Sequence, residues 1–286
     1  MKRLFSQFLY AVFTLCTLSS SLHTRSATIP ADGELFKING SQGQLACKLL
    51  LPQINEGEKC PIVILSHGFG GNMESHLWEL ITSRLNEAGI GVFKFDFNGH
   101  GQSDGLFQNM TVPNENMDLL SVISYVRTLP MTKNISLMGH SQGGVVTSMV
   151  SGDCGAEQIE CEVLLAAAAV LREDALKGTT MGAKFDPWHL DAPYVTLPHG
   201  DRLGREYIQT AMSLPIYETA ERFTGPALVI NGMADQIVPY TYGELYHKVL
   251  KNSDLILIPG ENHGFTVATG YVVDLVCDWL TKHLQK

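Results

Sequence analysis

A serine lies at the centre of a Gly-X-Ser-X-Gly pattern at residues 139–143, where the sequence reads GHSQG. The apolar run ending at Met138 should form a strand and the run after the pattern a helix, which puts Ser141 on a tight strand-to-helix turn. On such a turn the neighbours must be small, and the serine side chain lies at the amino end of the helix, where developing negative charge is stabilised. This context favours a nucleophile over a glycine-rich turn with an incidental serine.

A nucleophilic serine needs a base, and the base needs a carboxylate that orients it. Asp235 follows the apolar run PALVING, and His263 follows the run LILIPG. Both should therefore lie at the same sheet edge as Ser141, because the carboxyl ends of parallel strands share one edge. The chain order of serine, acid and histidine is also the order found in folds that contain this turn. We predict Ser141, Asp235 and His263 as a catalytic triad.

The other candidates for base and acid fit less well. His67 and His140 belong to tight backbone motifs, where they should pack or bond locally, and His100 lies in a loop after an earlier strand. Glu261 is the nearest competitor for the acid, but it is only two positions from the predicted base. We expect it to be a loop residue.

A carbonyl under attack also needs hydrogen-bond donors for its oxyanion, each worth roughly 10²–10³ in rate. Residues 67–71 (HGFGG) follow the apolar run PIVILS and resemble the HGGG-type loop that supplies one donor. We expect that donor to be the backbone N–H of Phe69. The second should be the backbone N–H of Gln142, directly after the nucleophile.

Short apolar runs alternate with amphipathic helical runs along most of the chain, which predicts a mostly parallel sheet covered by helices on both faces. Two antiparallel strands should extend one side of this sheet. From about residue 170 to 215 the rhythm breaks, with no clean strand and with frequent Gly, Pro, His and aromatic residues. We expect an inserted lid over the active edge. The expected strands are 34–39, 44–51, 61–66, 91–97, 135–138, 162–167, 227–231 and 255–258, and the expected helices are 74–88, 115–129, 145–150 and 271–284.

The first residues have the charged, apolar and small-polar order of a secretory signal. Lys2 and Arg3 precede the apolar run 8–18, and three serines follow. The apolar run is shorter than the roughly 20 residues of a spanning helix. We therefore expect residues 1–27 to be a signal peptide and the protein to be secreted or periplasmic, with an uncleaved anchor as the alternative. The cleavage position is left open.

Export would make disulfides permissible, since they form in oxidising compartments. Cys47 with Cys60, or Cys154 with Cys161, could form a bridge across a short connection. Buried free thiols are an equal alternative, because spacing alone does not decide between them.

The chain of 286 residues has a net charge of −9, which argues against a nucleic-acid partner because phosphate binding needs a basic face. No CxxC or His-rich cluster suggests a metal site. We expect neither a metal nor a cofactor. Monomer and homodimer are both left open.

Seven stretches together resemble the cinnamoyl (feruloyl) esterases of the α/β-hydrolase superfamily. The resemblance runs from about residue 34 to the C-terminus. HGFGG and GHSQGG are shared by many hydrolases, whereas FDFNGHGQSDG combined with LPIYE is far more particular. The matching stretches are HGFGGN (67–72), FDFNGHGQSDG (95–105), MTVPNEN (110–116), GHSQGGVV (139–146), ALKGTTMG (175–182), LPIYETAERFTGPALVINGMAD (214–235) and IPGENHGF (258–265).

The resemblance implies an α/β-hydrolase fold over residues 28–286, with a small lid between the sixth strand and the following helix. It also implies the same triad and the same oxyanion pair. In such enzymes polar lid residues bind the phenolic hydroxyls of the acyl group, and Asp186, His189 and Tyr207 are the candidates here. The DPWH stretch at 186–189 departs from the family pattern, and Tyr207 is the best placed of the three.

The activity implied is hydrolysis of hydroxycinnamate esters, either small aromatic esters or feruloylated oligosaccharides, through an acyl-enzyme. The same machinery also fits a short-chain acyl esterase, a monoacylglycerol-type lipase or a serine peptidase, because fold and triad do not fix the substrate. A non-catalytic binding protein is a remote alternative, since such proteins typically lose a triad member. Serine in place of aspartate at position 141 argues against a haloalkane dehalogenase.

Overall fold

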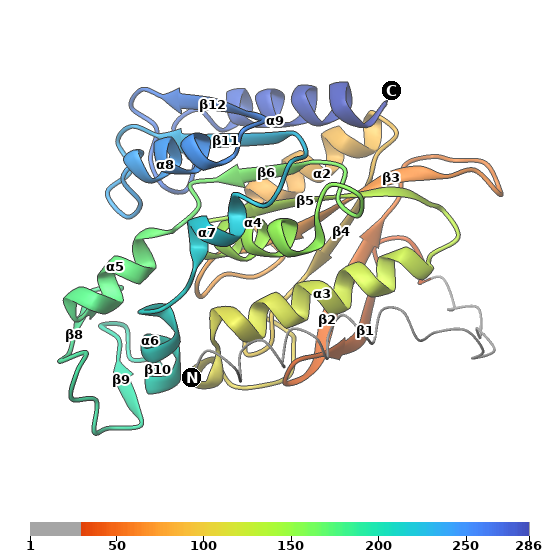
Figure 1. Ribbon diagram of the computed structural model, residues 1–286. Helices are drawn as coiled ribbons and strands as arrows, with labels where there is room; N and C mark the ends of the chain where they lie inside the picture. The colour runs from red at the N-terminus through yellow and green to blue at the C-terminus, as the bar shows by residue number, and fades with distance from the viewer. Residues whose placement is uncertain (1–29, 286) are drawn as a thin grey trace.

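The computed structural model describes residues 30–285, so the expected signal peptide lies outside the described residues. An eight-stranded sheet forms the centre of the molecule (Figure 1), and its strand order is β1-β2-β4-β3-β5-β6-β11-β12. The strands are β1 (Leu35–Gly40), β2 (Gly43–Leu50), β3 (Cys60–Ser66), β4 (Gly91–Phe95), β5 (Thr132–His140), β6 (Glu162–Leu165), β11 (Ala227–Gly232) and β12 (Ser253–Ile258). Each of them overlaps a strand expected from the sequence.

Six of these strands pair in parallel, and the two N-terminal strands extend one side in antiparallel pairing. β1 pairs with β2, and β2 pairs with β4, both antiparallel. All pairs from β4 through β3, β5, β6 and β11 to β12 are parallel. The prediction of a mostly parallel sheet with two antiparallel strands at one side is confirmed.

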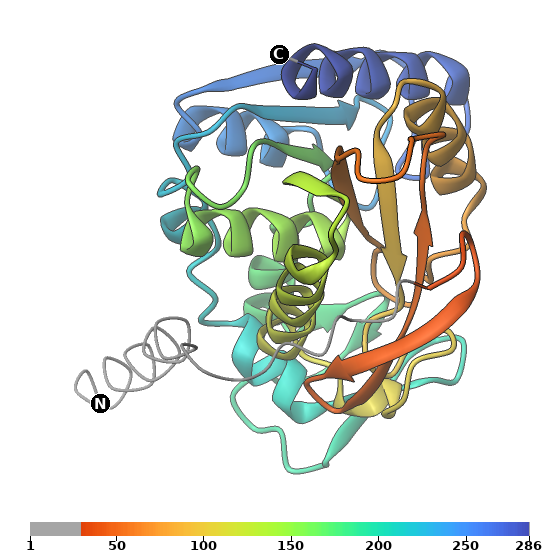
Figure 2. The same cartoon turned by 90° about the vertical axis from the view of Figure 1, so that its right-hand side faces the viewer.

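Helices cover both faces of the sheet (Figures 1 and 2). Every residue of β3 is buried, and successive side chains of a strand point to opposite faces. Ile62 and Ile64 belong to the core that includes side chains of α3 (Val112–Thr128) and α4 (Gln142–Cys154). Val63 and Leu65 belong to the core with α2 (His76–Glu87) and α9 (Thr269–Leu284). Residues 61–66 (PIVILS) form an unbroken apolar run because both faces of β3 are buried.

Helix α3 begins three residues before its expected start. Thr111 has extended backbone and accepts a hydrogen bond from Asn114 N, which caps the helix, and Pro113 occupies the first turn, where its missing N–H costs nothing. Helix α8 (Thr241–Val249) was not expected at all. It is short, with only nine residues, and only Gly243 and Tyr246 are buried. Its apolar residues Tyr242, Leu245, Tyr246 and Val249 nevertheless recur at helical spacing, so the sequence carried a helical signal that the prediction did not use.

The insertion (residues 170–215) contains helices and four very short strands, where the sequence predicted no clean strand. The strands have only two or three residues and pair with each other in two separate two-stranded sheets, so none carries an apolar run. Figure 1 shows the insertion at the lower left, beside the layers of sheet and helices. Its elements are α5 (Val170–Lys177), β7 (Thr179–Thr180), β8 (Ala183–Lys184), β9 (Tyr194–Thr196), β10 (Arg202–Gly204) and α6 (Arg205–Ala211), and α7 (Ile216–Ala220) follows.

The cysteines of the described chain are all buried, and Cys47 and Cys60 are free thiols. The bridge left open between these two is therefore absent. Burial raises the pKa of both thiols, which keeps them protonated and unreactive. Within residues 30–285, no helix has the length and apolar character needed to cross a bilayer.

Glu162 on β6 is fully buried, and burial raises the pKa of its carboxyl group to about 8, against a smaller lowering by Ser151. The unfolded chain ionises this group near pH 4.5, so between about pH 4.5 and 8 the folded state holds more protons than the unfolded state. Stability should therefore fall as pH rises through this window. The Gln side chain of Glu162→Gln is neutral at every pH. The Tm of this variant minus the Tm of wild type should therefore increase as pH rises from 5 to 8.

Thermal unfolding of both proteins at several pH values measures this difference. Glu160→Gln is the matched control, because Glu160 is exposed on the neighbouring loop. A Tm difference between wild type and Glu162→Gln that stays constant from pH 5 to 8 would contradict the assignment.

Candidate active site

The segments that follow three strands of the sheet bring Ser141, Asp235 and His263 together. Ser141 directly follows β5, Asp235 follows β11, and His263 follows β12. These strands belong to the parallel part of the sheet, so their carboxyl ends lie at one edge. The juxtaposition predicted from the sequence is therefore present.

The backbone at Ser141 has φ 57° and ψ −123°, a conformation that residues other than glycine rarely adopt. Close packing around the turn holds it there. A Cβ atom on Gly139 would overlap the carbonyl of Gly143, and a Cβ atom on Gly143 would overlap the carbonyls of Ser66 and His67. Both glycines are thus required for strand and helix to approach, as expected for a nucleophile elbow.

A chain of two hydrogen bonds joins the three side chains. His263 Nε2 lies 3.0 Å from Ser141 Oγ, and His263 Nδ1 lies 2.7 Å from Asp235 Oδ2. The carboxylate of Asp235 keeps the proton on Nδ1, which leaves Nε2 free to accept the serine proton. The arrangement can generate a nucleophilic alkoxide at Ser141.

Asp235 is itself held by the backbone that follows it. Its Oδ1 accepts hydrogen bonds from Ile237 N and Val238 N, both at 2.8 Å. Its side chain is fully buried, while 15% of the His263 side chain is exposed. The acid is thus orientated and shielded, and the base remains within reach of solvent and substrate.

The loop after β3 packs directly against the nucleophile. A Cβ atom on Gly68 would come within 2.9 Å of Ser141 Cβ. His67 fixes this loop: its Nε2 accepts from Phe97 N at 3.1 Å, so its Nδ1–H donates to Gly68 O at 2.8 Å. Burial lowers the pKa of His67 to about 4, so the imidazole stays neutral and keeps this pattern at ordinary pH.

His100 supports the same loop from the segment after β4. Its Nε2 accepts from Gly70 N at 3.3 Å. Burial lowers the pKa of His100 to about 4, which preserves the acceptor. The sequence motif GHGQSDG contained this histidine, but its role depends on a contact across 30 residues.

The two expected oxyanion donors have their N–H groups available. Gln142 is the first residue of α4, and N–H groups in the first turn of a helix have no partner within it. Neither Gln142 N nor Phe69 N donates to another residue of the described chain. A negative oxygen beside Ser141 would face the amino end of α4, where negative charge is stabilised.

Two residues that the sequence did not assign to the site hold the loop of His263. The buried carboxylate of Glu261 accepts from the backbone N of Asn262, Val267 and Ala268 at 2.9, 3.0 and 2.7 Å. His140 Nε2 lies 2.8 Å from the carbonyl oxygen of His263 and donates to it. Glu261 is thus a loop residue, as expected, and it also positions the predicted base.

The insertion brings one of its three candidate residues to the site. Tyr207 on α6 is buried, and its hydroxyl donates to Gln142 Oε1 at 2.7 Å. Asp186 and His189 lie on the exposed surface of the insertion, where they bond to each other at 2.9 Å. The structure therefore does not bring Asp186 and His189 to the triad.

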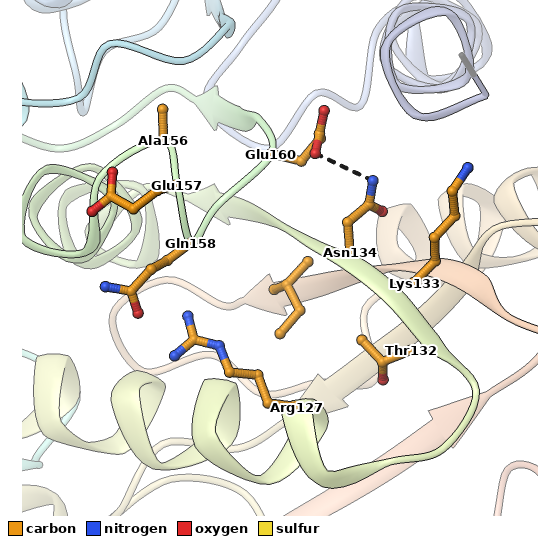
Figure 3. Close-up of a pocket in the computed structure, with 9 residues that line it drawn as sticks. Arg127, Thr132, Lys133, Asn134, Ala156, Glu157, Gln158 and Glu160 are labelled. Atoms are coloured by element: carbon orange, nitrogen blue, oxygen red, sulfur yellow. Dashed lines mark hydrogen bonds between the residues drawn. The ribbon is translucent and has the colours of Figure 1, made fainter. Parts of the chain in front are cut away.

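The pocket drawn in Figure 3 belongs to a different part of the molecule. It has a volume of about 410 Å³ and lies between the carboxyl end of α3 and the amino end of β5, with Arg127 and Thr132 among its lining residues. Ser141 follows the opposite end of β5. Within residues 30–285 no group of three or more His, Cys, Asp or Glu side chains could hold a metal ion.

Comparison with known proteins points to serine hydrolases. Residues 57–197 match a family model described as "Serine aminopeptidase, S33". The fold is similar to that of Est1E from Butyrivibrio proteoclasticus, solved with ferulic acid bound. The TM-score is 0.83 at 29% sequence identity, and the match covers 88% of this chain and 100% of Est1E.

Two curated relatives are 28% and 25% identical to this chain. The uncharacterized protein YfhR of Escherichia coli (strain K12) is 28% identical over 205 residues, which is 70% of this chain. The chain spans only 62% of the length of YfhR. A monoacylglycerol lipase of Mycolicibacterium smegmatis is 25% identical over 261 residues, covering 78% of this chain and 89% of the lipase. The chain has the α/β-hydrolase fold.

Removal of Glu261 should reduce activity by misplacing His263. Glu261→Ala leaves three backbone N–H groups of the loop that carries His263 without their side-chain acceptor. A displacement of about 1 Å in a catalytic group can cost about 10²-fold in rate. We expect kcat/KM toward the activated ester p-nitrophenyl acetate to fall by about that factor, with a lower Tm. Glu261→Gln, which keeps one oxygen acceptor, should lie between.

Steady-state kinetics and thermal unfolding test this expectation. Glu244→Ala, an exposed change on α8, serves as the control. Wild-type kcat/KM in Glu261→Ala would show that the loop holds His263 without this carboxylate.

Proposed function

We propose that this protein is a serine hydrolase, namely a carboxylesterase that cleaves hydroxycinnamate esters, such as feruloyl esters, through an acyl-enzyme on Ser141. The observation that carries the proposal is the similarity to Est1E over nearly the whole described chain, with ferulic acid bound in that structure. The hydrogen-bonded series Ser141, His263 and Asp235 supports the chemistry.

In the acylation step, Ser141 Oγ attacks the ester carbonyl carbon while its proton moves to His263 Nε2. Asp235 stabilises the imidazolium that forms. The backbone N–H groups of Phe69 and Gln142 would donate to the oxyanion of the tetrahedral intermediate. Its collapse breaks the bond to the alcohol oxygen, which leaves with the proton from His263.

In the deacylation step, a water molecule takes the place of the alcohol. His263 Nε2 accepts one proton of the water, whose oxygen attacks the acyl carbon. The second tetrahedral intermediate returns the proton to Ser141 Oγ and releases the acid. The balance is one water consumed and one acid and one alcohol formed, without a cofactor.

Aromatic side chains beside the oxyanion loop support an aromatic acyl group. The ring of Phe69 meets the ring of Phe107 edge-on at a centroid distance of 5.2 Å and the ring of Tyr207 at 5.8 Å. Phe69 and Phe107 are only half-buried. A planar phenylpropenoyl group could extend this edge-to-face packing, which stabilises aromatic pairs by about 0.5–1.5 kcal/mol beyond burial.

Ser141→Ala should abolish release of ferulate from methyl ferulate. Loss of the nucleophile removes the covalent step, and rate reductions of about 10⁶-fold accompany such changes in serine hydrolases. Liquid chromatography of free ferulate measures the reaction, and product binding by Ser141→Ala checks that the site is intact. Undiminished turnover by this variant would contradict the assignment of Ser141 as the nucleophile. Absence of turnover by wild type would contradict the proposed substrate.

The monoacylglycerol lipase similarity and the aminopeptidase description favour rival substrates. A panel of methyl ferulate, butyryl ester, monoacylglycerol and amino-acid p-nitroanilide separates them under equal conditions. We expect kcat/KM for methyl ferulate to exceed the others by at least about tenfold, since one well-placed ring contributes more than 1.4 kcal/mol. A preference for monoacylglycerol would support the lipase instead.

A further inference from the structure

Three buried polar side chains form a hydrogen-bonded chain beside the nucleophile, called the relay below. They come from three different parts of the sequence. Glu115 lies on α3, Gln142 begins α4, and Tyr207 lies on α6 of the insertion. Each of them is only 2% exposed. The Tyr207 hydroxyl donates to Gln142 Oε1 at 2.7 Å, and Gln142 Nε2 donates to Glu115 Oε2 at 2.8 Å.

The relay fixes the orientation of the Gln142 side chain. Its carbonyl oxygen accepts from the Tyr207 hydroxyl and its amide nitrogen donates to Glu115, so both ends of the amide are hydrogen-bonded. Met110 Sδ also lies 3.2 Å from Gln142 Nε2. With both ends of the amide held, the first residue of α4 has little freedom to move.

The Tyr207 hydroxyl is committed to this relay. A phenol has a single hydrogen to donate, and that of Tyr207 is directed at Gln142. Burial raises the pKa of Tyr207, which keeps the hydroxyl protonated and able to donate. The hydroxyl is therefore not free to donate to a substrate at the same time.

We propose that Tyr207 and Glu115 are positioning residues for the oxyanion hole: they hold the Gln142 side chain, and so the Gln142 backbone N–H, beside Ser141. The insertion then contributes to the rate of the chemical step through Tyr207. This inference rests on the ester hydrolysis in the proposed function, but it does not depend on the feruloyl group.

Mutation of the hydroxyl alone separates this role from recognition of the substrate phenol. Tyr207→Phe keeps the ring against Phe69 and removes the donor to Gln142. Loss of a whole oxyanion donor costs about 10²–10³ in kcat. Looser positioning of one donor should cost less, about tenfold. The loss should be similar for p-nitrophenyl acetate, methyl cinnamate and methyl ferulate, and KM should change by less than about twofold, because the interaction acts in the transition state.

If the Tyr207 hydroxyl instead bound the phenolic hydroxyl of the substrate, Tyr207→Phe would give a different result. The variant would then have a higher KM for methyl ferulate and an unchanged KM for methyl cinnamate, which has no ring hydroxyl. That outcome, or wild-type kcat on all three esters, would overturn the proposal. Tyr217→Phe is the matched control, because the Tyr217 hydroxyl donates to the carbonyl of Tyr242 outside the relay.

Variants at the other end of the relay give a second test. Glu115→Gln retains an oxygen that can accept from Gln142 Nε2, so kcat should stay within about twofold of wild type. Glu115→Leu removes the acceptor and should lower kcat on p-nitrophenyl acetate by about tenfold, the same factor as Tyr207→Phe. Equal activity of the two Glu115 variants would contradict the relay. If Glu115→Leu does not fold, Tyr207→Phe decides alone.

The wild-type assays keep the two proposals apart. Wild-type turnover of p-nitrophenyl acetate without turnover of methyl ferulate would reject the hydroxycinnamate substrate, while the positioning test would still proceed on the acetate. Normal ferulate turnover with unchanged kcat in Tyr207→Phe would reject only the positioning role.

Discussion

The strained backbone of Ser141 is the constraint on which the rest of the site depends. A positive φ at a serine persists only where its surroundings leave no alternative. Here β5 and α4 approach so closely that Gly139 and Gly143 have no room for a Cβ atom. The same close approach puts the loop after β3 against Ser141 and points the amino end of α4 at the reaction centre. One tight turn thus sets the positions of the nucleophile and of both expected oxyanion donors.

Buried polar side chains then hold the surrounding loops to that turn. Glu261 accepts hydrogen bonds from three backbone N–H groups of the loop that carries His263. His67 and His100 connect the loop after β3 to the segment after β4 by hydrogen bonds. Glu115 reaches the turn itself through Gln142. Such groups are costly to bury unless they are hydrogen-bonded, so each of them fixes its loop in one conformation. The edge of the sheet is thereby rigid enough to align three loops from distant parts of the chain.

Much of this architecture could be predicted from the sequence, because the signals were local. Strands buried on both faces appear as unbroken apolar runs, as β3 does, and the turn at Ser141 needs small residues within two positions. The weak elements were missed for the same reason. The strands of the insertion have two or three residues each and leave no periodic pattern. Helix α8 does carry apolar residues at helical spacing (Tyr242, Leu245, Tyr246 and Val249), and the prediction missed it nonetheless. The early start of α3 depends on the cap at Thr111.

By itself the sequence determined the fold class and the residues that meet at the sheet edge, since parallel strands place the residues that follow them on one side. Only the tertiary structure decided which side chains support them. Glu115 and Glu261 are acidic residues that nothing in their sequence neighbours distinguishes from surface residues, and their partners depend on how the elements pack. The same holds for the insertion: Tyr207 turns inward to Gln142, whereas Asp186 and His189 bond to each other in solvent. Hydrogen bonds between distant segments leave no local pattern, because they depend on three-dimensional distance.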